Sequence, residues 1–142
     1  MQLTSRDLNV AAIATRALLD SVLDDVGITF ETSLVLAQAY RSPAGVTLAE
    51  LTERFVVDAR RPADAVPGIV AAARQAGLVQ GVDPLHVTDA GRRLQEAIDT
   101  QVATIVARVY ADLDPADLET AGRVVDRITV QARAELARRT AA

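Results

Sequence analysis

Residues 72–98 read AARQAGLVQGVDPLHVTDAGRRLQEAI and decide the fold of this chain. The first part has the pattern of a helix end, and Gly77 lacks the Cβ that hinders a left-handed helix stop. The apolar residues on either side of GVDP predict two short strands, about 78–80 and 85–88, joined by a turn. Thr88 can then cap a new helix. The order of helix, two-stranded ribbon and helix predicts a wing.

Three helices are expected upstream of this stretch. Their predicted extents are from Thr4 or Ser5 to about Asp25 with a stop at Gly27, from a Thr29 cap to about Tyr40, and a short helix opened by TLAE at 47–50. TLAE is a capping box, because the Thr47 hydroxyl can bond the amide of Glu50 while the carboxylate reaches back. The short helix and the helix that ends at Gly77 together predict a helix-turn-helix ahead of the wing.

The segment that leads to Gly77 contains two prolines. Pro67 inside a helix would remove a backbone hydrogen bond and clash with the carbonyl of residue 63. We therefore predict that this helix is broken or kinked between Asp64 and Gly68, and that Pro62–Val66 forms a turn of its own.

Two long apolar stripes follow the ribbon. The first runs along residues 94–113 of the helix that begins at Thr88, and Asp114 then caps a last helix with a stripe along 118–136. With the stripe of the first helix, this surface exceeds what one small lobe can cover. An exposed apolar patch of that size is an aggregation hazard, so we expect a homodimer.

The composition narrows the class of protein. The chain has 142 residues, half of them hydrophobic, and no cysteine, which excludes a disulfide framework and a thiolate metal site. The opening MQLTSRDLNVAAIA lacks the basic start and long apolar core of a signal peptide, and no run approaches the ~18 apolar residues of a membrane span. We therefore expect a soluble, cytoplasmic protein that does not contact a membrane.

The charge of the chain is unevenly distributed. All fifteen basic residues are arginine, and the net charge is −4. Residues 41–93 carry seven arginines against six acids, whereas both flanks are net acidic. The middle of the chain therefore permits contact with nucleic acid without requiring it.

Four segments carry a resemblance to a known family: GITFETSLVLAQA at 27–39, TLAELTERF at 47–55, AARQAGLVQ at 72–80 and VTDAGRRLQEAI at 87–98. In this order they resemble the MarR family of winged-helix transcriptional regulators. The resemblance implies a mainly α fold of the α+β winged-helix type. It implies a single domain over 1–142, with a winged-helix lobe at 29–93 between dimerisation helices at 1–26 and 94–142. It also implies a homodimer that binds double-stranded DNA and a small aromatic or acidic ligand.

The base-contacting surface that the resemblance implies has an unusual composition in this chain. A recognition helix that begins near Pro62 has Asp64 as the single polar side chain of its first turns, and Asp83 occupies the wing tip where an arginine would enter the minor groove. We therefore expect contacts to phosphates rather than to bases. The candidate DNA-binding residues are Arg41, Arg54, Arg60, Arg61, Arg74 and Arg92, with Arg93 as an alternative to the last. Each can also be an ordinary solvated side chain.

Three residues are candidates for a ligand site. Arg16 lies among apolar neighbours on the first helix and can hold a carboxylate with two hydrogen bonds, although an intersubunit salt bridge or an exposed side chain explains it as well. Phe30 and Tyr40 bracket the second helix and are candidate pocket walls, although core packing explains Phe30 equally.

No group of residues indicates catalysis. His86 is the single histidine, and one histidine without cysteine does not make a recognisable metal site. There is no glycine-rich phosphate loop and no nucleophile beside a base. We expect no enzyme activity, no catalytic residue, no metal and no cofactor.

Two hypotheses of different class follow. The first is a homodimeric, ligand-responsive, MarR-like DNA-binding transcriptional regulator. The alternative is a winged-helix dimer that has lost sequence-specific DNA binding and serves as a ligand-binding or protein-interaction module. The alanine-rich recognition segment and the acidic wing favour the alternative.

Overall fold

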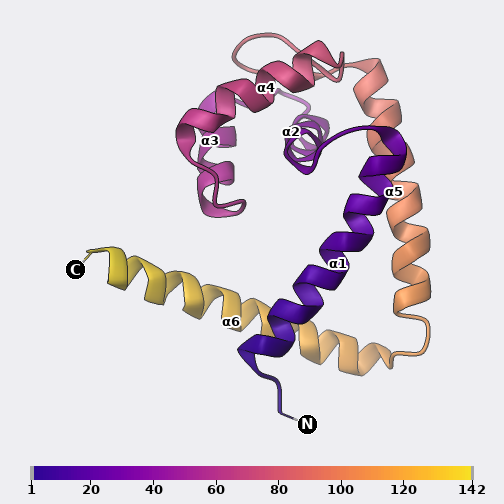
Figure 1. Cartoon of the computed structure of the whole chain (residues 1–142), viewed down its shortest axis with the longest axis vertical. Coiled ribbons are helices and arrows are strands. Elements are labelled where there is room, and N and C mark those ends of the chain that lie inside the picture. The colour runs from indigo at the N-terminus through magenta and orange to yellow at the C-terminus, as the bar shows by residue number, and fades with distance from the viewer. Residues whose placement is uncertain (1, 142) are drawn as a thin grey trace. The chain divides into compact units, whose positions relative to one another are not determined.

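The computed structural model describes residues 2–141. Its elements are α1 (Ser5–Val26), α2 (Phe30–Arg41), α3 (Leu48–Val57), the 3-10 turn η1 (Ala63–Ala65), α4 (Val66–Gln75), β1 (Val79–Gln80), β2 (His86–Val87), α5 (Asp89–Val109) and α6 (Pro115–Ala141) (Figure 1). They form two compact units, one that extends to Ile105 and one that begins at Val106. The mainly α winged-helix architecture expected from the sequence is confirmed.

The predicted helix starts are confirmed by their hydrogen bonds. At the start of α1, the amide of Thr4 donates to the carboxylate of Asp7 over 2.9 Å. At the start of α3, the amide of Thr47 donates to Glu50 over 2.8 Å, and the amide of Glu50 donates to the Thr47 hydroxyl over 3.2 Å. The hydrogen bonds from the Thr47 amide and hydroxyl hold the pKa of the Glu50 carboxyl below its usual range. Such caps satisfy amides that have no partner within a helix.

The predicted break between Asp64 and Gly68 is confirmed, although Val66 belongs to α4 and not to the preceding turn. Residues Ala63–Ala65 form a 3-10 turn that follows Pro62, and α4 begins only at Val66. Pro67 therefore lies in the first turn of α4, where its missing N–H leaves no helical hydrogen bond unmade. The helix ends, as expected, before a left-handed Gly77 with φ 72°.

The lobe is built around α2. Leu51 and Phe55 of α3 and Val66 and Val70 of α4 pack with buried residues of α2 in one core cluster. Figure 1 shows α3 and α4 following one another around α2, which is seen along its axis. A second cluster joins the last turns of α1 to Ile98 of α5. Because α4 packs Val66, Val70 and Ala73 into the first cluster, its opposite face is exposed and remains open to a partner.

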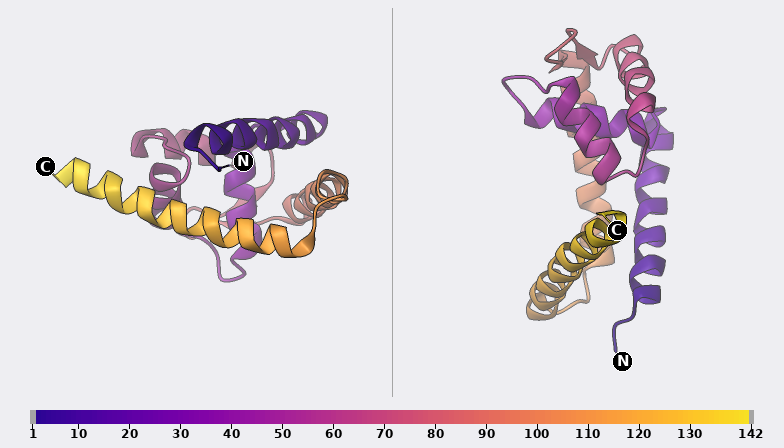
Figure 2. Two further views of the ribbon diagram at one scale, coloured as in Figure 1. Left: turned by 90° about the horizontal axis from the view of Figure 1, so that it is seen from below. Right: turned by 90° about the vertical axis from the view of Figure 1, so that its left-hand side faces the viewer.

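The wing is short. Strands β1 and β2 pair antiparallel with Val79 opposite Val87, and a bridge joins Val46 to Leu85. Compared with the prediction, β1 is one residue shorter at its start, and β2 is one residue shorter at each end. The hairpin lies beside the start of α5 (Figure 2, right). Two-residue strands limit the reach of the turn between them, since a strand rises only about 3.3 Å per residue.

The start of α5 is hydrogen-bonded to the turn that follows α4. The Thr88 hydroxyl donates to the carbonyl of Gly77 and accepts a hydrogen bond from the amide of Gly91 over 3.0 Å. A Cβ on Gly91 would lie 2.1 Å from the carbonyl oxygen of Leu78. The backbones therefore approach so closely here that only glycine fits without a shift.

The unit that begins at Val106 holds the last turn of α5 and all of α6. The Asp114 carboxylate accepts from the amide of Ala116 over 2.7 Å, which confirms the predicted cap. Within Pro115–Ala141 no residue is buried. Among residues 2–141, no helix combines the length and the apolar character that crossing a bilayer would require.

Candidate nucleic-acid interface

The recognition segment presents small side chains. On η1 and the first turns of α4, Ala63, Asp64, Pro67 and Gly68 are exposed, and Asp64 is the one among them with hydrogen-bonding side-chain atoms. A Cβ built on Gly68 would meet nothing within 4 Å. Since base edges are read by hydrogen bonds from longer polar side chains, this surface can follow the shape of a duplex but offers little direct readout.

Arg60 and Arg61 precede this segment and have different surroundings. Arg60 is exposed, has a left-handed backbone with φ 53° and forms no ion pair within residues 2–141. The guanidinium of Arg61 forms an ion pair with Glu31 at the start of α2, and its amide donates to the carbonyl of Phe55 over 2.9 Å. The structure therefore leaves Arg60 available to an external phosphate and uses Arg61 to hold the turn against α2.

The carboxyl group of Glu31 has a lowered pKa. The largest cause is a hydrogen bond from its own backbone amide, followed by the hydrogen bond and charge of Arg61 and the charge of Arg16, while partial burial opposes the shift. The acid lies in the first turn of α2, thirty residues from its partner, so no local spacing indicates the pair.

Arg74 has an internal contact on α4. Its Nε donates to the carbonyl of Gly81 in the wing turn over 3.1 Å. This bond fastens the last turn of α4 to the wing. The guanidinium is still exposed, so a DNA phosphate could bind it only alongside the hydrogen bond to the wing carbonyl.

The acidic wing tip also has a structural contact. The Oδ1 atom of Asp83 accepts a hydrogen bond from the backbone amide of Leu48, the first residue of α3, over 3.1 Å. A carboxylate is favoured at a helix N-terminus, where unpaired amides and the helix dipole concentrate positive charge. The wing therefore folds back onto α3, and Val82, with 75% of its surface exposed, is left at the tip. Nothing in the local sequence indicates this cap, because the two residues are thirty-five positions apart.

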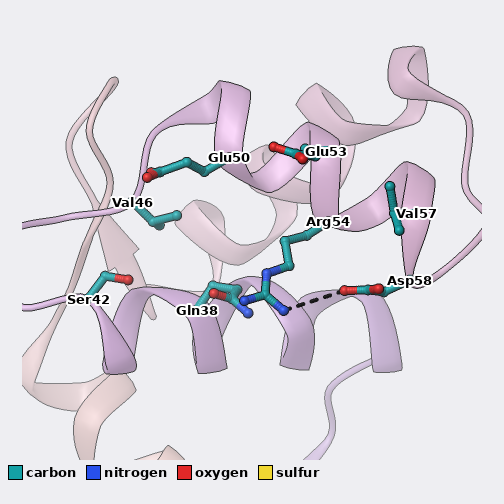
Figure 3. A pocket seen from close by; sticks show the side chains of 8 residues that line it. All are labelled: Gln38, Ser42, Val46, Glu50, Glu53, Arg54, Val57 and Asp58. Carbon is teal, nitrogen blue, oxygen red and sulfur yellow. Dashed lines mark hydrogen bonds and ion pairs between the residues drawn. The ribbon is translucent and has the colours of Figure 1, made fainter. Parts of the chain in front are cut away.

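Arg54 lines a cavity of about 480 Å³ between the end of α2 and α3 (Figure 3). Its guanidinium lies 3.4 Å from a carboxylate oxygen of Asp58. Glu50 and Glu53 line the same cavity, so the three acids outnumber the single arginine. A phosphate would be repelled rather than held inside this cavity.

The remaining candidates lie at the two ends of α2. Arg16 of α1 stacks on Phe30 with its Cζ 3.2 Å from the ring centroid, and its Nε lies 2.9 Å from Asp20. Tyr40 lies ten residues further along α2, which is about 15 Å at the helical rise, and Arg92 of α5 lies over its ring at 5.8 Å. The structure thus brings Arg16 and Phe30 together and separates both from Tyr40.

Arg41, Arg92 and Arg93 complete the set of exposed candidates. Arg41 is the last residue of α2 and, like Arg92 and Arg93, forms no ion pair within residues 2–141. In the same part of the chain, no group of three or more His, Cys, Asp or Glu side chains is arranged to hold a metal ion. Among the candidate residues that precede the wing, the arginines whose side chains form no hydrogen bond or ion pair within residues 2–141 are therefore Arg41 and Arg60.

No protein-family model and no curated protein matches the chain. Several solved structures match it. CouR of Rhodococcus jostii bound to p-coumaroyl-CoA is 18% identical, with a TM-score of 0.71 over 86% of this chain and 88% of that one. The MarR-family protein Rv2887 of Mycobacterium tuberculosis in complex with DNA is 23% identical, with a TM-score of 0.71 over 90% and 98%. The same protein in complex with salicylic acid is 24% identical, with a TM-score of 0.64 over 85% and 94%.

These likenesses extend over 85% to 90% of this chain and 88% to 98% of the matched chains. At such low identity they establish the backbone arrangement and not the side chains that act on it. The chain has the winged-helix fold of the MarR-family transcriptional regulators.

Proposed function

We propose that this chain is a cytoplasmic, homodimeric, MarR-like transcriptional regulator that binds duplex DNA and responds to a small ligand. The observation that carries the proposal is the likeness, over 90% of the chain, to a MarR-family protein solved in complex with DNA. The open face of α4 lies on the second helix of a helix-turn-helix, the place from which such folds reach the major groove.

The unpaired arginines support binding through phosphates. Arg41 and Arg60 are exposed and have no ion pair within residues 2–141, whereas Arg54, Arg61 and Arg74 already have partners in the lobe. In a dimer, Arg41 and Arg60 together supply about four phosphate contacts. Four neutralised phosphates give a salt slope near −3.6, which is about a hundredfold loss of affinity between 50 and 200 mM salt.

Binding titrations test this proposal. We would measure affinity at several salt concentrations on a duplex selected from a random library and on its shuffled counterpart. We expect weak discrimination between the two, and we expect Arg60→Ala to reduce the magnitude of the salt slope by about one unit per subunit. Arg61→Ala should change the slope less, because its guanidinium is held by Glu31. Arg127→Ala on α6 is the matched control.

The outcomes separate the two hypotheses. Selective binding that does not depend on salt and survives Arg60→Ala would contradict phosphate-dominated recognition. Absence of binding to any duplex at low salt would favour the alternative, a winged-helix dimer that serves as an interaction or ligand-binding module. The small side chains on α4 and the use of Asp83 as a helix cap are the observations that favour this alternative.

The ligand part of the proposal concerns Arg16 and Phe30. Two similar structures hold p-coumaroyl-CoA and salicylic acid, and each ligand has an aromatic ring and acidic groups. Here a guanidinium already stacks on an aromatic ring, and its present partner, Asp20, is a solvent-exposed carboxylate that a ligand carboxylate can replace. Calorimetric titration of an aromatic acid into wild type and Arg16→Ala would measure this contribution.

A further inference from the structure

A separate cavity lies at the other end of α2. It has a volume of about 290 Å³ and lies among the end of α2, the base of the wing and the first turns of α5. The residues that line it are Ala39, Tyr40, Ser42, Pro43, Gln80, His86, Val87 and Arg92. None of these side chains is a carboxylate.

The polar side chains of this cavity have no hydrogen-bonding partner in the part of the chain that the structure describes. Within residues 2–141, the side chains of Tyr40, Ser42, Gln80, His86 and Arg92 make no hydrogen bond and no ion pair. Among these five side chains, the guanidinium of Arg92 lies over the ring of Tyr40. Each of the five can donate a hydrogen bond, and one of them carries a permanent positive charge.

Other cavities with an arginine differ in this respect. Arg54 shares its cavity with three acids and pairs with Asp58. Arg61 lines a cavity beside η1 and pairs there with Glu31. In the cavity at Tyr40, by contrast, the guanidinium has no internal counter-charge, and the exposed Arg41 follows directly on α2.

We propose that the cavity lined by Tyr40, Ser42, His86 and Arg92 is a binding site for an oxyanion, namely the carboxylate or phosphate group of a small molecule with a compact apolar body, or a phosphate of the DNA backbone. A set of donors around one cation matches the several acceptor lone pairs of an oxyanion. The side chains of Ala39, Pro43 and Val87 give the cavity an apolar wall for the rest of the ligand. The site is separate from the pair formed by Arg16 and Phe30, and it does not depend on whether the chain regulates transcription.

The single histidine of the chain makes the site directly observable. His86 lines the cavity, so its imidazole resonances report on occupancy without interference from any other histidine. Benzoate, phenyl phosphate and inorganic phosphate would be titrated into the full chain at constant ionic strength, with neutral benzamide as the matched ligand control. We expect saturable shifts of the His86 signals with the three anions and none with benzamide.

Variants of neighbouring arginines test the assignment. Arg92→Ala should weaken binding of benzoate on the order of tenfold, because a charge-assisted hydrogen bond is lost. Arg93→Ala removes the same charge from the next position of α5, outside the cavity lining, and should leave binding unchanged. Equal losses in both variants, or shifts that do not saturate, would overturn the proposal. A melting curve of each variant checks that the lobe stays folded.

A further titration identifies the source of the oxyanion. A short duplex would be added to the protein already loaded with benzoate. If the duplex displaces benzoate from wild type, the natural occupant is a phosphate of the DNA backbone. If the His86 shifts persist while the duplex is bound, the occupant is a small molecule. Failure of the duplex to bind at all would count against the proposed function and leave the oxyanion site standing.

Discussion

Single residues decide which arginines of this protein can face a partner. Arg60 and Arg61 are adjacent in the chain and both are exposed, but Arg60 forms no ion pair within residues 2–141 whereas Arg61 is paired with Glu31. Similarly, Arg54 and Arg74 have internal partners. The number of basic residues in a segment therefore overestimates the positive charge that it can offer to DNA.

Glu31 makes the stability of the lobe depend on pH. Its folded-state pKa lies below the ordinary value of 4.5, so its contribution is fully present above that pH and is lost as pH falls through the lowered value. We expect Glu31→Gln to reduce the free energy of unfolding at pH 7 and to have a smaller effect at pH 3. Urea unfolding of wild type and variant at both pH values measures the difference.

The Arg61→Ala variant indicates which contact of Glu31 matters. The largest cause of the lowered pKa is the backbone hydrogen bond of Glu31 itself, and this bond survives in Arg61→Ala. The pH-dependent difference should therefore shrink without disappearing in that background. A Glu31→Gln effect of equal size at pH 3 and pH 7 would show that the ionised carboxylate contributes nothing.

At the scale of elements, two glycines near the recognition surface have opposite environments. A Cβ at Gly91 would lie 2.1 Å from the Leu78 carbonyl oxygen, whereas one at Gly68 would meet nothing. We expect Gly91→Ala to cost at least about 2 kcal/mol in the free energy of unfolding, because α5 must move away from the backbone of Leu78, the residue before β1. Gly68→Ala should raise it by up to about 1 kcal/mol.

Chemical denaturation of both variants checks these expectations, and DNA binding adds a second measurement. If Gly68 allows close approach of α4 to a duplex, then Gly68→Ala will be more stable and bind more weakly. Unchanged affinity in the stabilised variant would show that α4 does not approach DNA closely at this position. A Gly91→Ala protein as stable as wild type would contradict the close approach seen between α5 and β1.

Local signals predicted the elements well, and long-range pairs could not be predicted. The caps at Thr4 and Thr47 and the break at Pro67 each depend on a few neighbouring residues, and the structure confirms them. By contrast, the Asp83 cap of α3 and the pair of Glu31 with Arg61 join residues about thirty positions apart. Side chains of that kind meet only after the lobe has folded, so a single sequence gives no spacing that indicates them.

The same distinction applies to the candidate sites. The sequence predicts Arg16, Phe30 and Tyr40 as candidates for one ligand site; in the structure Arg16 and Phe30 lie in contact, but Tyr40 belongs to a different cavity with Arg92. Phe30 and Tyr40 both occur on α2, and a sequence pattern does not reveal that different elements cover its two ends. The roles of these residues and of the arginines stay predictions.

On the scale of the whole molecule, the flanking helices leave apolar surface uncovered. Within Pro115–Ala141 no residue is buried, and Val124, Val125, Val130 and Leu136 are among the exposed large apolar side chains. On α1, Val10 and Ile13 are exposed as well. A second copy of the chain is the simplest cover for these helices, because a soluble monomer rarely leaves so much apolar surface open.

Two valines of α6 test whether this surface is the dimer interface. Val125 lies on the stripe along 118–136, whereas Val130 lies about 140° around the helix from it, at 100° per residue. Both are exposed within one chain, with 43% and 60% of their surfaces accessible, so neither substitution removes core packing. We expect wild type and Val130→Glu to be dimers at micromolar concentration by light scattering. Val125→Glu should shift the protein toward monomer, because a carboxylate buried in an apolar interface has no partner. A monomeric wild type, or a Val125→Glu protein as dimeric as Val130→Glu, would show that the stripe on α6 is not the interface.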